Sequence, residues 1–154
     1  MKHDRQQIAA LPLRMGPRGT VEVLMITSRD TGRWVVPKGW TMPGRQPWDA
    51  AAIEALEEAG VEGSIGQEPF GAYKYRKRFD DGTSRKVRVE VYPLIVETLL
   101  PRWKEKDERT REWFPTREAA KLVDEADLAD LLTQIRRKPK KLRPQLKFLK
   151  RATA

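Results

Sequence analysis

Three glutamates in one short segment are the residues of this chain most able to do chemistry. Glu54, Glu57 and Glu58 are spaced at i, i+3 and i+4. On an α-helix this spacing puts them on one face, over about 6 Å of the helix axis. Like charges crowded on a helix are destabilising unless a cation relieves them. The spacing therefore indicates either a cation site or a solvated acidic helix face.

The residues around these glutamates favour a helix that packs closely on its other side. Trp48, Leu56 and four alanines, at positions 51, 52, 55 and 59, make an apolar stripe of mostly small side chains. Pro47 suits the first helical turn, and Gly60 suits the position just after the helix ends. We therefore expect a helix over residues 47–59 that presents its carboxylates away from the core.

The composition limits which ion such a site would bind. Mg²⁺ and Mn²⁺ are hard ions that take carboxylate oxygens, backbone carbonyls and water, often together with substrate phosphates. The chain has no cysteine and one histidine, His3. A zinc site of soft ligands is thus excluded, and the expected cofactor is Mg²⁺ or Mn²⁺.

Residues 39–61, GWTMPGRQPWDAAAIEALEEAGV, resemble the signature of the Nudix hydrolases, Gx5Ex7REUxEExGU, in which U is aliphatic. Matching residues stand at Gly39, Glu54, Ala55, Glu57, Glu58, Gly60 and Val61. Arg45 replaces the usual glutamate and Ile53 the usual arginine. In the family these two residues form an ion pair. Because both partners are exchanged, neither is left as an unpaired charge where the ion pair stood. We interpret the change as a different contact between the loop and the helix, beside an intact metal site. The alternative is an inactive copy.

The resemblance implies a fold and a reaction. The implied fold is a Nudix-type α/β/α sandwich with a mixed β-sheet, and the reaction is hydrolysis of a pyrophosphate linkage by an enzyme that binds metal. Glu54, Glu57, Glu58 and the Gly39 carbonyl would hold the ion. Glu57 or Glu54 would be catalytic, with Glu57 the preferred general base. The other candidate bases are Glu105, Glu108 and Glu112, unless these belong only to an exposed charged loop.

The segments WVVPKGW and AAAIEALEEAGVEG are most similar to the branch of diphosphoinositol polyphosphate and diadenosine polyphosphate hydrolases. This similarity predicts cleavage of a highly phosphorylated small molecule. The alternatives are an RNA 5′-end pyrophosphohydrolase and a non-catalytic phosphate- or RNA-binding module on the same scaffold. Cations bind phosphate oxygens through charge-assisted hydrogen bonds. The substrate-binding candidates are Lys38, Arg45, Arg14, Lys74 and Arg76, followed by Arg29 and Arg88.

The remaining chain reads as strands followed by helices, the pattern of a layered α/β domain. Apolar and alternating runs predict strands over residues 8–14, 20–28, 33–37, 68–79, 85–100 and 110–115, and helices from Thr116 and over 124–135. Alternate members of the segment KYRKR, residues 74–78, must lie on opposite faces of their strand.

Charge divides the chain into two parts. Of its 154 residues, those from position 136 onward include nine Lys or Arg and no acid, which accounts for the whole net charge of +9. We expect a Nudix domain over 1–135 and a basic tail over 136–154 that binds polyanions weakly and nonspecifically. The N-terminus lacks an apolar leader, no run could span a membrane, and cysteine is absent; these features favour the cytoplasm. The oligomeric state is left open.

Overall fold

A computed structural model describes residues 6–137 of the chain. The strands are β1 (Gln6–Met15), β2 (Val21–Thr27), β3 (Trp34–Val35), β4 (Lys38–Trp40), β5 (Val61–Ile65), β6 (Gly71–Arg78), β7 (Ser84–Leu99) and β8 (Arg111–Pro115). The helical segments are α1 (Pro47–Glu54), η2 (Ala55–Ala59), η3 (Lys106–Glu108), α2 (Thr116–Leu122) and α3 (Ala126–Arg137). Residues 138–154 of the expected basic tail lie outside the described residues.

Two long strands, β1 and β7, form the centre of the sheet. They run parallel, with Ile8 opposite Glu90 and Leu13 opposite Ile95, and every other strand pair is antiparallel. The outer edge of β1 is shared between β2 and β4, and the outer edge of β7 between β5 and β6. The sheet is therefore mixed and forked, with two arms at each end of the central pair.

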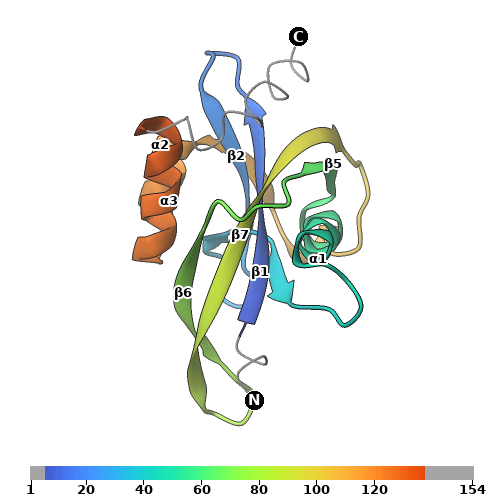
Figure 1. Cartoon of the computed structure of the whole chain (residues 1–154), viewed down its shortest axis with the longest axis vertical. Helices are drawn as coiled ribbons and strands as arrows, with labels where there is room; N and C mark the ends of the chain where they lie inside the picture. Colours follow the sequence, from blue (N-terminus) through green and yellow to red (C-terminus); the bar gives the residue numbers. More distant parts are fainter. Residues whose placement is uncertain (1–5, 138–154) are drawn as a thin grey trace.

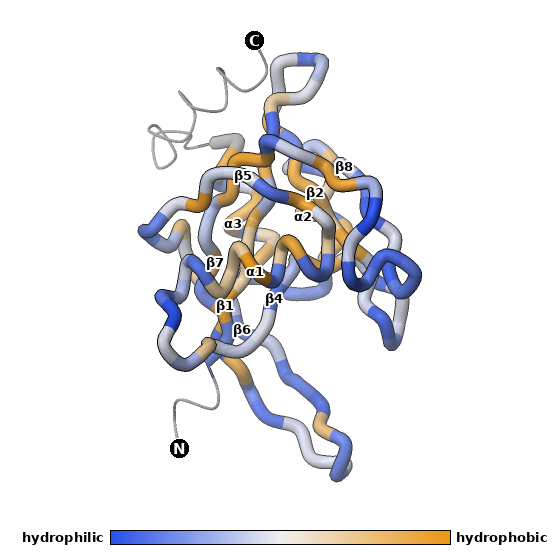
Figure 2. The backbone as a smooth tube through the Cα atoms, turned by 90° about the vertical axis from the view of Figure 1, so that its right-hand side faces the viewer, coloured by the Kyte–Doolittle hydropathy of each residue, from blue (hydrophilic) through white to orange (hydrophobic). Residues whose placement is uncertain are grey.

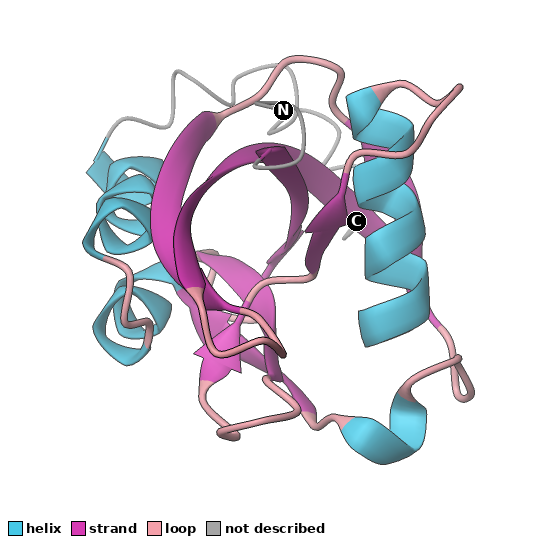
Figure 3. Ribbon diagram, turned by 90° about the horizontal axis from the view of Figure 1, so that it is seen from below, coloured by secondary structure: helices cyan, strands magenta, loops and turns pink. Residues whose placement is uncertain are grey.

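Helices cover both faces of this sheet, as Figure 1 shows for α1 on one side and α2 and α3 on the other, and Figure 3 from below. Two core clusters result. One, with Leu128 and Leu132, lies between the sheet and α2 and α3; the other, with Ala51 and Ala55, lies under α1. Alternate residues of β1 enter opposite clusters, Ala9 the first and Ile8 the second, because successive side chains of a strand point to opposite faces. The α/β/α sandwich with a mixed sheet is confirmed.

Most of the expected strands and helices are present, and two strands were not expected. The segment Val61–Ile65 pairs with the far half of β7, and Lys38–Trp40 pairs with β1 at Gln7–Ala9. We expected Lys38 and Gly39 to lead directly into a loop. Among the described residues, no helix is long and apolar enough to cross a membrane.

The β6–β7 hairpin projects beyond the body of the molecule (Figure 2). Its turn at Asp80–Gly82 uses a left-handed glycine with φ 86° at Gly82. The projecting part is mostly hydrophilic along its length.

Candidate active site

The acidic helix begins at Pro47, as expected, and continues without a break from α1 into η2. Its last turn is wider than an α-turn, because the Gly60 N–H donates to the Ala55 carbonyl as well as to that of Leu56. Gly60 ends the helix in the left-handed region at φ 67°, which suits a residue without a Cβ. Wide turns of this kind are rare and occur often at functional sites.

Small side chains let this helix lie close to the sheet. Ala50, Ala51, Ala55 and Ala59 are fully buried, so the helix backbone approaches β1 closely. Of the predicted stripe, three alanines (51, 55 and 59) and Trp48 join this packing, whereas Ala52 and Leu56 are only partly buried and Ala50 takes part instead. Glu54, Glu57 and Glu58 are partly buried residues, so the acidic face of the helix is only partly shielded from solvent.

Gly39 lies directly against the acidic helix. A Cβ built on Gly39 would overlap the Glu54 carboxylate. The Lys38 N–H donates to Glu58 Oε1 at 3.2 Å. Strand β4 therefore brings the signature glycine and two of the three signature glutamates together, and a side chain at position 39 would displace the Glu54 carboxylate from its present position.

The electrostatics of the three glutamates favour a cation. Burial, followed by the charges of Glu58 and Glu57, raises the pKa of Glu54 from 4.5 to about 8. Burial also raises the pKa of Glu58, although Arg109 and the Lys38 N–H oppose that shift. A positive ion among these oxygens would lower both pKa values, and oxygen donors suit hard ions such as Mg²⁺.

The present side-chain positions do not yet enclose an ion. Within residues 6–137, no three acidic or histidine side chains converge on one metal position. Two of the three carboxylates lie near a cation of the chain instead: Glu57 Oε1 lies 3.6 Å from Lys104 Nζ, and Glu58 Oε2 lies 3.5 Å from Arg109 Nη2. The donor set fits a hard divalent ion in its chemistry, and binding one requires rotation of these side chains.

Arg109 is a site residue that sequence reasoning missed. Its side chain, 8 % exposed, contacts Glu58 and donates from Nε to Glu105 Oε1 at 2.8 Å and from Nη1 to the Thr27 carbonyl at 3.0 Å. The Glu105 N–H donates to the Glu57 carbonyl. A single buried guanidinium therefore joins the loop after β7 to the acidic helix. In the sequence it was hidden in a run of charges that resembles an exposed loop.

The three candidate bases outside the signature are placed differently. Glu105 is 13 % exposed, and its charge acts on Glu54 and Glu58. Glu108 is exposed and pairs with Arg29 at 3.1 Å, and Glu112 is exposed on β8. Of the three, the structure thus brings Glu105 to the acidic cluster.

The C-terminal end of the acidic helix is held by a guanidinium and an indole. Arg111 donates from Nη1 to the carbonyls of Ala59 at 2.9 Å and Gly60 at 3.2 Å, and from Nη2 to that of Leu100 at 2.8 Å. It stacks on Trp103 at 3.9 Å, and the Trp103 indole donates to the Glu58 carbonyl. A cation at a helix C-terminus also complements the helix dipole.

A second polar cluster contains Arg33 and Glu125, and Lys38 lies between it and the acidic helix, since the charges of both Glu58 and Glu125 act on the Lys38 ammonium. Arg33 Nη2 pairs with Glu125 Oε2 at 2.8 Å, yet Arg33 Nη1 and Glu125 Oε1 are buried without a hydrogen-bond partner. Burial lowers the pKa of the Lys38 ammonium, and the charges of Glu58 and Glu125 act to raise it. Tyr75, whose ring lies 5.1 Å from Lys38 Nζ, donates from its hydroxyl to Gln7. We did not anticipate this cluster from the sequence, apart from Lys38.

The other predicted phosphate-binding cations lie apart from the acidic helix or are exposed. Arg14 pairs with Glu22 at 2.8 Å and stacks on Trp113, about 20 Å along β1 from the pairing of Ile8 with Gly39, at roughly 3.3 Å per residue. Arg45 is exposed in the loop before α1. Lys74 and Arg76 are exposed on β6.

Comparison with known proteins places this geometry in a family. The NUDIX domain family model matches residues 5–135. The chain therefore belongs to the Nudix family, as its signature segment predicted. It is 39% identical over 105 residues to diphosphoinositol polyphosphate phosphohydrolase 3-beta of Homo sapiens and 37% identical over 105 residues to diphosphoinositol polyphosphate phosphohydrolase 2 of Rattus norvegicus. Each match covers 66% of this chain and 60% or 54% of the relative, so the chain spans little more than half of their length.

Solved structures agree on the fold. An Ap4A hydrolase of C. elegans aligns with a TM-score of 0.58 at 22% identity, over 84% of this chain and 94% of that one. The E. coli ORF135 protein aligns with a TM-score of 0.61 at 18% identity, over 85% and 89%. At these identities the likeness concerns the fold alone.

Proposed function

We propose that this chain is a pyrophosphohydrolase that depends on a divalent metal and acts on a highly phosphorylated small molecule of the diphosphoinositol polyphosphate or diadenosine polyphosphate type. The observation that carries the proposal is the packing of Glu54 against Gly39, with Glu58 held by the Lys38 N–H. Family membership and the names of the sequence relatives support the same reaction class.

The residues of the chain would divide the work of the reaction. Glu54, Glu57, Glu58 and the Gly39 carbonyl would hold Mg²⁺ or Mn²⁺. Such an ion neutralises charge on the phosphates and orients them for attack by water. Glu57, whose side chain is 36 % exposed and lies 3.6 Å from Lys104 Nζ, is the preferred proton acceptor. Its alternative is Glu105, which lies beside the cluster.

The cations near the acidic cluster would bind the remaining phosphates. The charge of the Lys38 ammonium interacts with that of Glu58, and Arg109 Nη2 lies 3.5 Å from the Glu58 carboxylate. Arg29, 55 % exposed, pairs with Glu108 in the loop between β7 and β8 that also carries Glu105. Several cations around one acidic cluster suit a substrate that carries many negative charges.

The test is a substrate panel with Mg²⁺ and with Mn²⁺: diadenosine polyphosphates, diphosphoinositol phosphates, nucleotide sugars and RNA with a 5′-triphosphate. Glu57→Gln and Glu105→Gln report on the general base, and Glu112→Gln on exposed β8 is the matched control. We expect wild-type turnover of a polyphosphate, a loss of 100-fold or more on removing the base, and an unchanged control. If neither ion supports turnover of any substrate, the non-catalytic module is the better account; if triphosphate RNA is preferred, the alternative of an RNA 5′-end pyrophosphohydrolase holds.

A further inference from the structure

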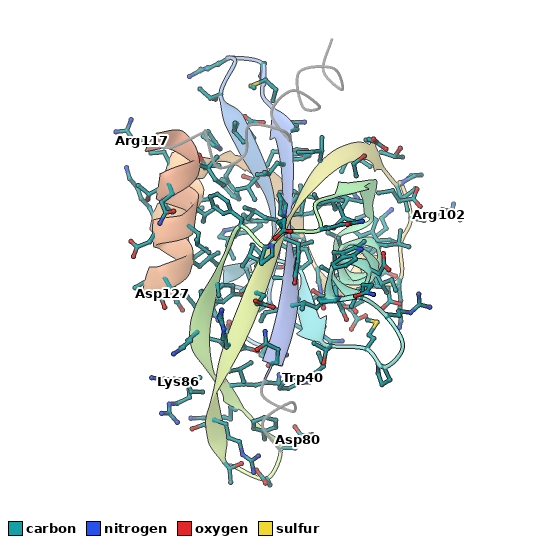
Figure 4. All side chains as sticks on the ribbon, viewed as in Figure 1. Trp40, Asp80, Lys86, Arg102, Arg117 and Asp127 are labelled. Carbon is teal, nitrogen blue, oxygen red and sulfur yellow. The ribbon has the colours of Figure 1, made fainter. Side chains whose placement is uncertain are left out.

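The projecting β6–β7 hairpin carries a row of cations on one face. In an antiparallel pair, residues directly opposite each other share a face. Lys74 lies opposite Arg88, and Arg76 opposite Lys86, with Arg78 next along β6. These five residues, here called the cationic ladder, are all exposed. Figure 4 shows Lys86 extending outward from the hairpin.

The ladder is not explained by the stability of the fold. Like charges directly opposite on neighbouring strands are destabilising, and the hairpin has two such pairs on this face. Among the described residues, Arg88 has an ion pair, with Glu90 at 3.8 Å, while no ion pair is formed by Lys74, Arg76, Arg78 or Lys86. Within residues 6–137, the Arg76 side chain makes one hydrogen bond, from Nη1 to the Ser84 hydroxyl. An external anion is therefore the partner that would relieve this arrangement.

The shape of the ladder selects the kind of anion. From residue 74 to 78 it extends about 13 Å along the strand, at roughly 3.3 Å per residue, with a second row beside it on β7. A regular row of this length suits phosphates repeated along a polymer better than a compact small molecule. The other residues on this face, Ala72, Ser84 and Glu90, include no aromatic ring on which a base could stack.

We propose that the cationic ladder is a binding surface for the phosphate backbone of nucleic acid, without sequence preference. A membrane surface is less suited, because binding to lipid also uses apolar side chains that enter the bilayer. Of the exposed large hydrophobic residues in the described chain, Leu122 lies in α2 and Leu99 lies at the far end of β7, where that strand pairs with β5. Neither lies in the projecting part of the hairpin. The ladder includes none of the residues that would hold the metal. Lys74 and Arg76, which the sequence suggested as substrate-binding residues, lie exposed on β6, so the proposal does not rest on the hydrolase activity.

The test measures binding of the full chain to a fluorescent single-stranded RNA with a 5′-hydroxyl, which is not a pyrophosphate substrate. The ladder variant is Lys74→Gln/Arg76→Gln/Lys86→Gln. The control variant, Arg18→Gln/Arg102→Gln/Arg117→Gln, removes the same charge from exposed residues; Arg102 and Arg117 lie away from the hairpin (Figure 4). This comparison keeps the basic tail intact in both proteins, so its contribution cancels.

We expect the ladder variant to bind 10- to 100-fold more weakly at about 0.1 M salt, and its slope of log affinity against log salt to be shallower by about 2, since each lost phosphate contact removes roughly 0.7. The control variant should keep its slope to within about 0.5 and bind poly(U) and poly(A) alike. The ladder variant should unfold at the same or a higher temperature, because like-charge pairs are removed. Equal losses of RNA affinity in the two variants would overturn the proposal. Binding to vesicles of phosphatidylserine and phosphatidylcholine is measured in parallel, and a ladder variant that lost affinity for vesicles but not for RNA would overturn it as well.

Discussion

Arg111 offers a quantitative test of how the acidic helix is held. Replacing it with Met keeps much of the volume of the side chain but removes the donors to the carbonyls of Ala59, Gly60 and Leu100. A hydrogen bond from a charged group contributes about 1.5–3 kcal/mol. Because Nη1 is shared between two carbonyls, we count two bonds, and because Arg111 is partly exposed we take the lower values. The expected loss in the free energy of unfolding is about 3 kcal/mol.

Arg111→Lys separates charge from geometry. The ammonium keeps the favourable interaction with the helix C-terminus, about 0.3–1 kcal/mol, and can reach one carbonyl, but it lacks the planar fork that reaches three. It also loses the flat stacking on Trp103, seen here at 3.9 Å. We therefore expect Arg111→Lys to lose about 1.5–2 kcal/mol, roughly half the loss of the Met variant.

Urea unfolding followed by circular dichroism measures both variants, with an unchanged m-value as the sign that the unfolded state is comparable. Arg102→Met, at an exposed residue in the preceding loop, is the control and should change stability by less than about 0.5 kcal/mol. A loss below 1 kcal/mol in Arg111→Met, or equal losses in the Lys and Met variants, would show that the three carbonyls do not depend on the guanidinium.

Three further outcomes are expected. The folded Glu54 binds its proton more tightly than the unfolded residue, at a pKa of about 8 against 4.5, so the metal-free protein should lose stability relative to Glu54→Gln as pH rises from 5 to 8. Mg²⁺ should raise the unfolding temperature more at pH 8 than at pH 5. Differential scanning fluorimetry measures both effects, and a wild type that gained stability relative to Glu54→Gln across that range would refute the reasoning. Gly39→Ala should lower turnover of the preferred substrate about 100-fold with an unchanged circular dichroism spectrum, because the Cβ displaces the Glu54 carboxylate; near-normal turnover would mean that this contact is not needed. Arg33→Met should cost about 3 kcal/mol in urea unfolding by leaving the buried Glu125 charge unpaired, whereas Arg33→Met/Glu125→Leu should recover most of that loss; equal costs would contradict a buried pair.

The parts of the fold that sequence predicted are those fixed by local patterns. The acidic helix follows from the alanine stripe, Pro47 and Gly60, and the long strand β7 from alternating valines that continue into an apolar run. Val61–Ile65 was missed because VEGSI is short and contains a glycine and polar residues; its strand character comes from pairing with β7. Lys38–Trp40 was missed because Pro37 and Gly39 are typical of loops, and here pairing with β1 decides the conformation.

The same division applies to the site. The signature glutamates and Gly39 were found because their spacing is local. Arg109 and Arg111 were missed because the helix residues that they contact are far away in sequence, 51 positions for Arg109 and Glu58 and 52 for Arg111 and Ala59. Glu105 was named as a candidate base, but the sequence alone did not separate it from Glu108 and Glu112. Arg45 and Ile53 were interpreted as a different contact between the loop and the helix; beside the acidic cluster it is Arg109 that supplies a buried cation, and Arg45 is exposed.

The forked sheet separates the molecule into two ends with different tolerance for change. At one end β4 and β6 branch from the central strands, and this end carries Gly39, Lys38 and the hairpin; at the other, β2 and β5 branch toward the exposed turn at residues 17–20. The central strands β1 and β7 run through both ends, and the acidic helix leads from β4 to β5. An epitope or fluorescent label inserted in that exposed turn would thus report on the protein while leaving its chemistry at the opposite pole undisturbed.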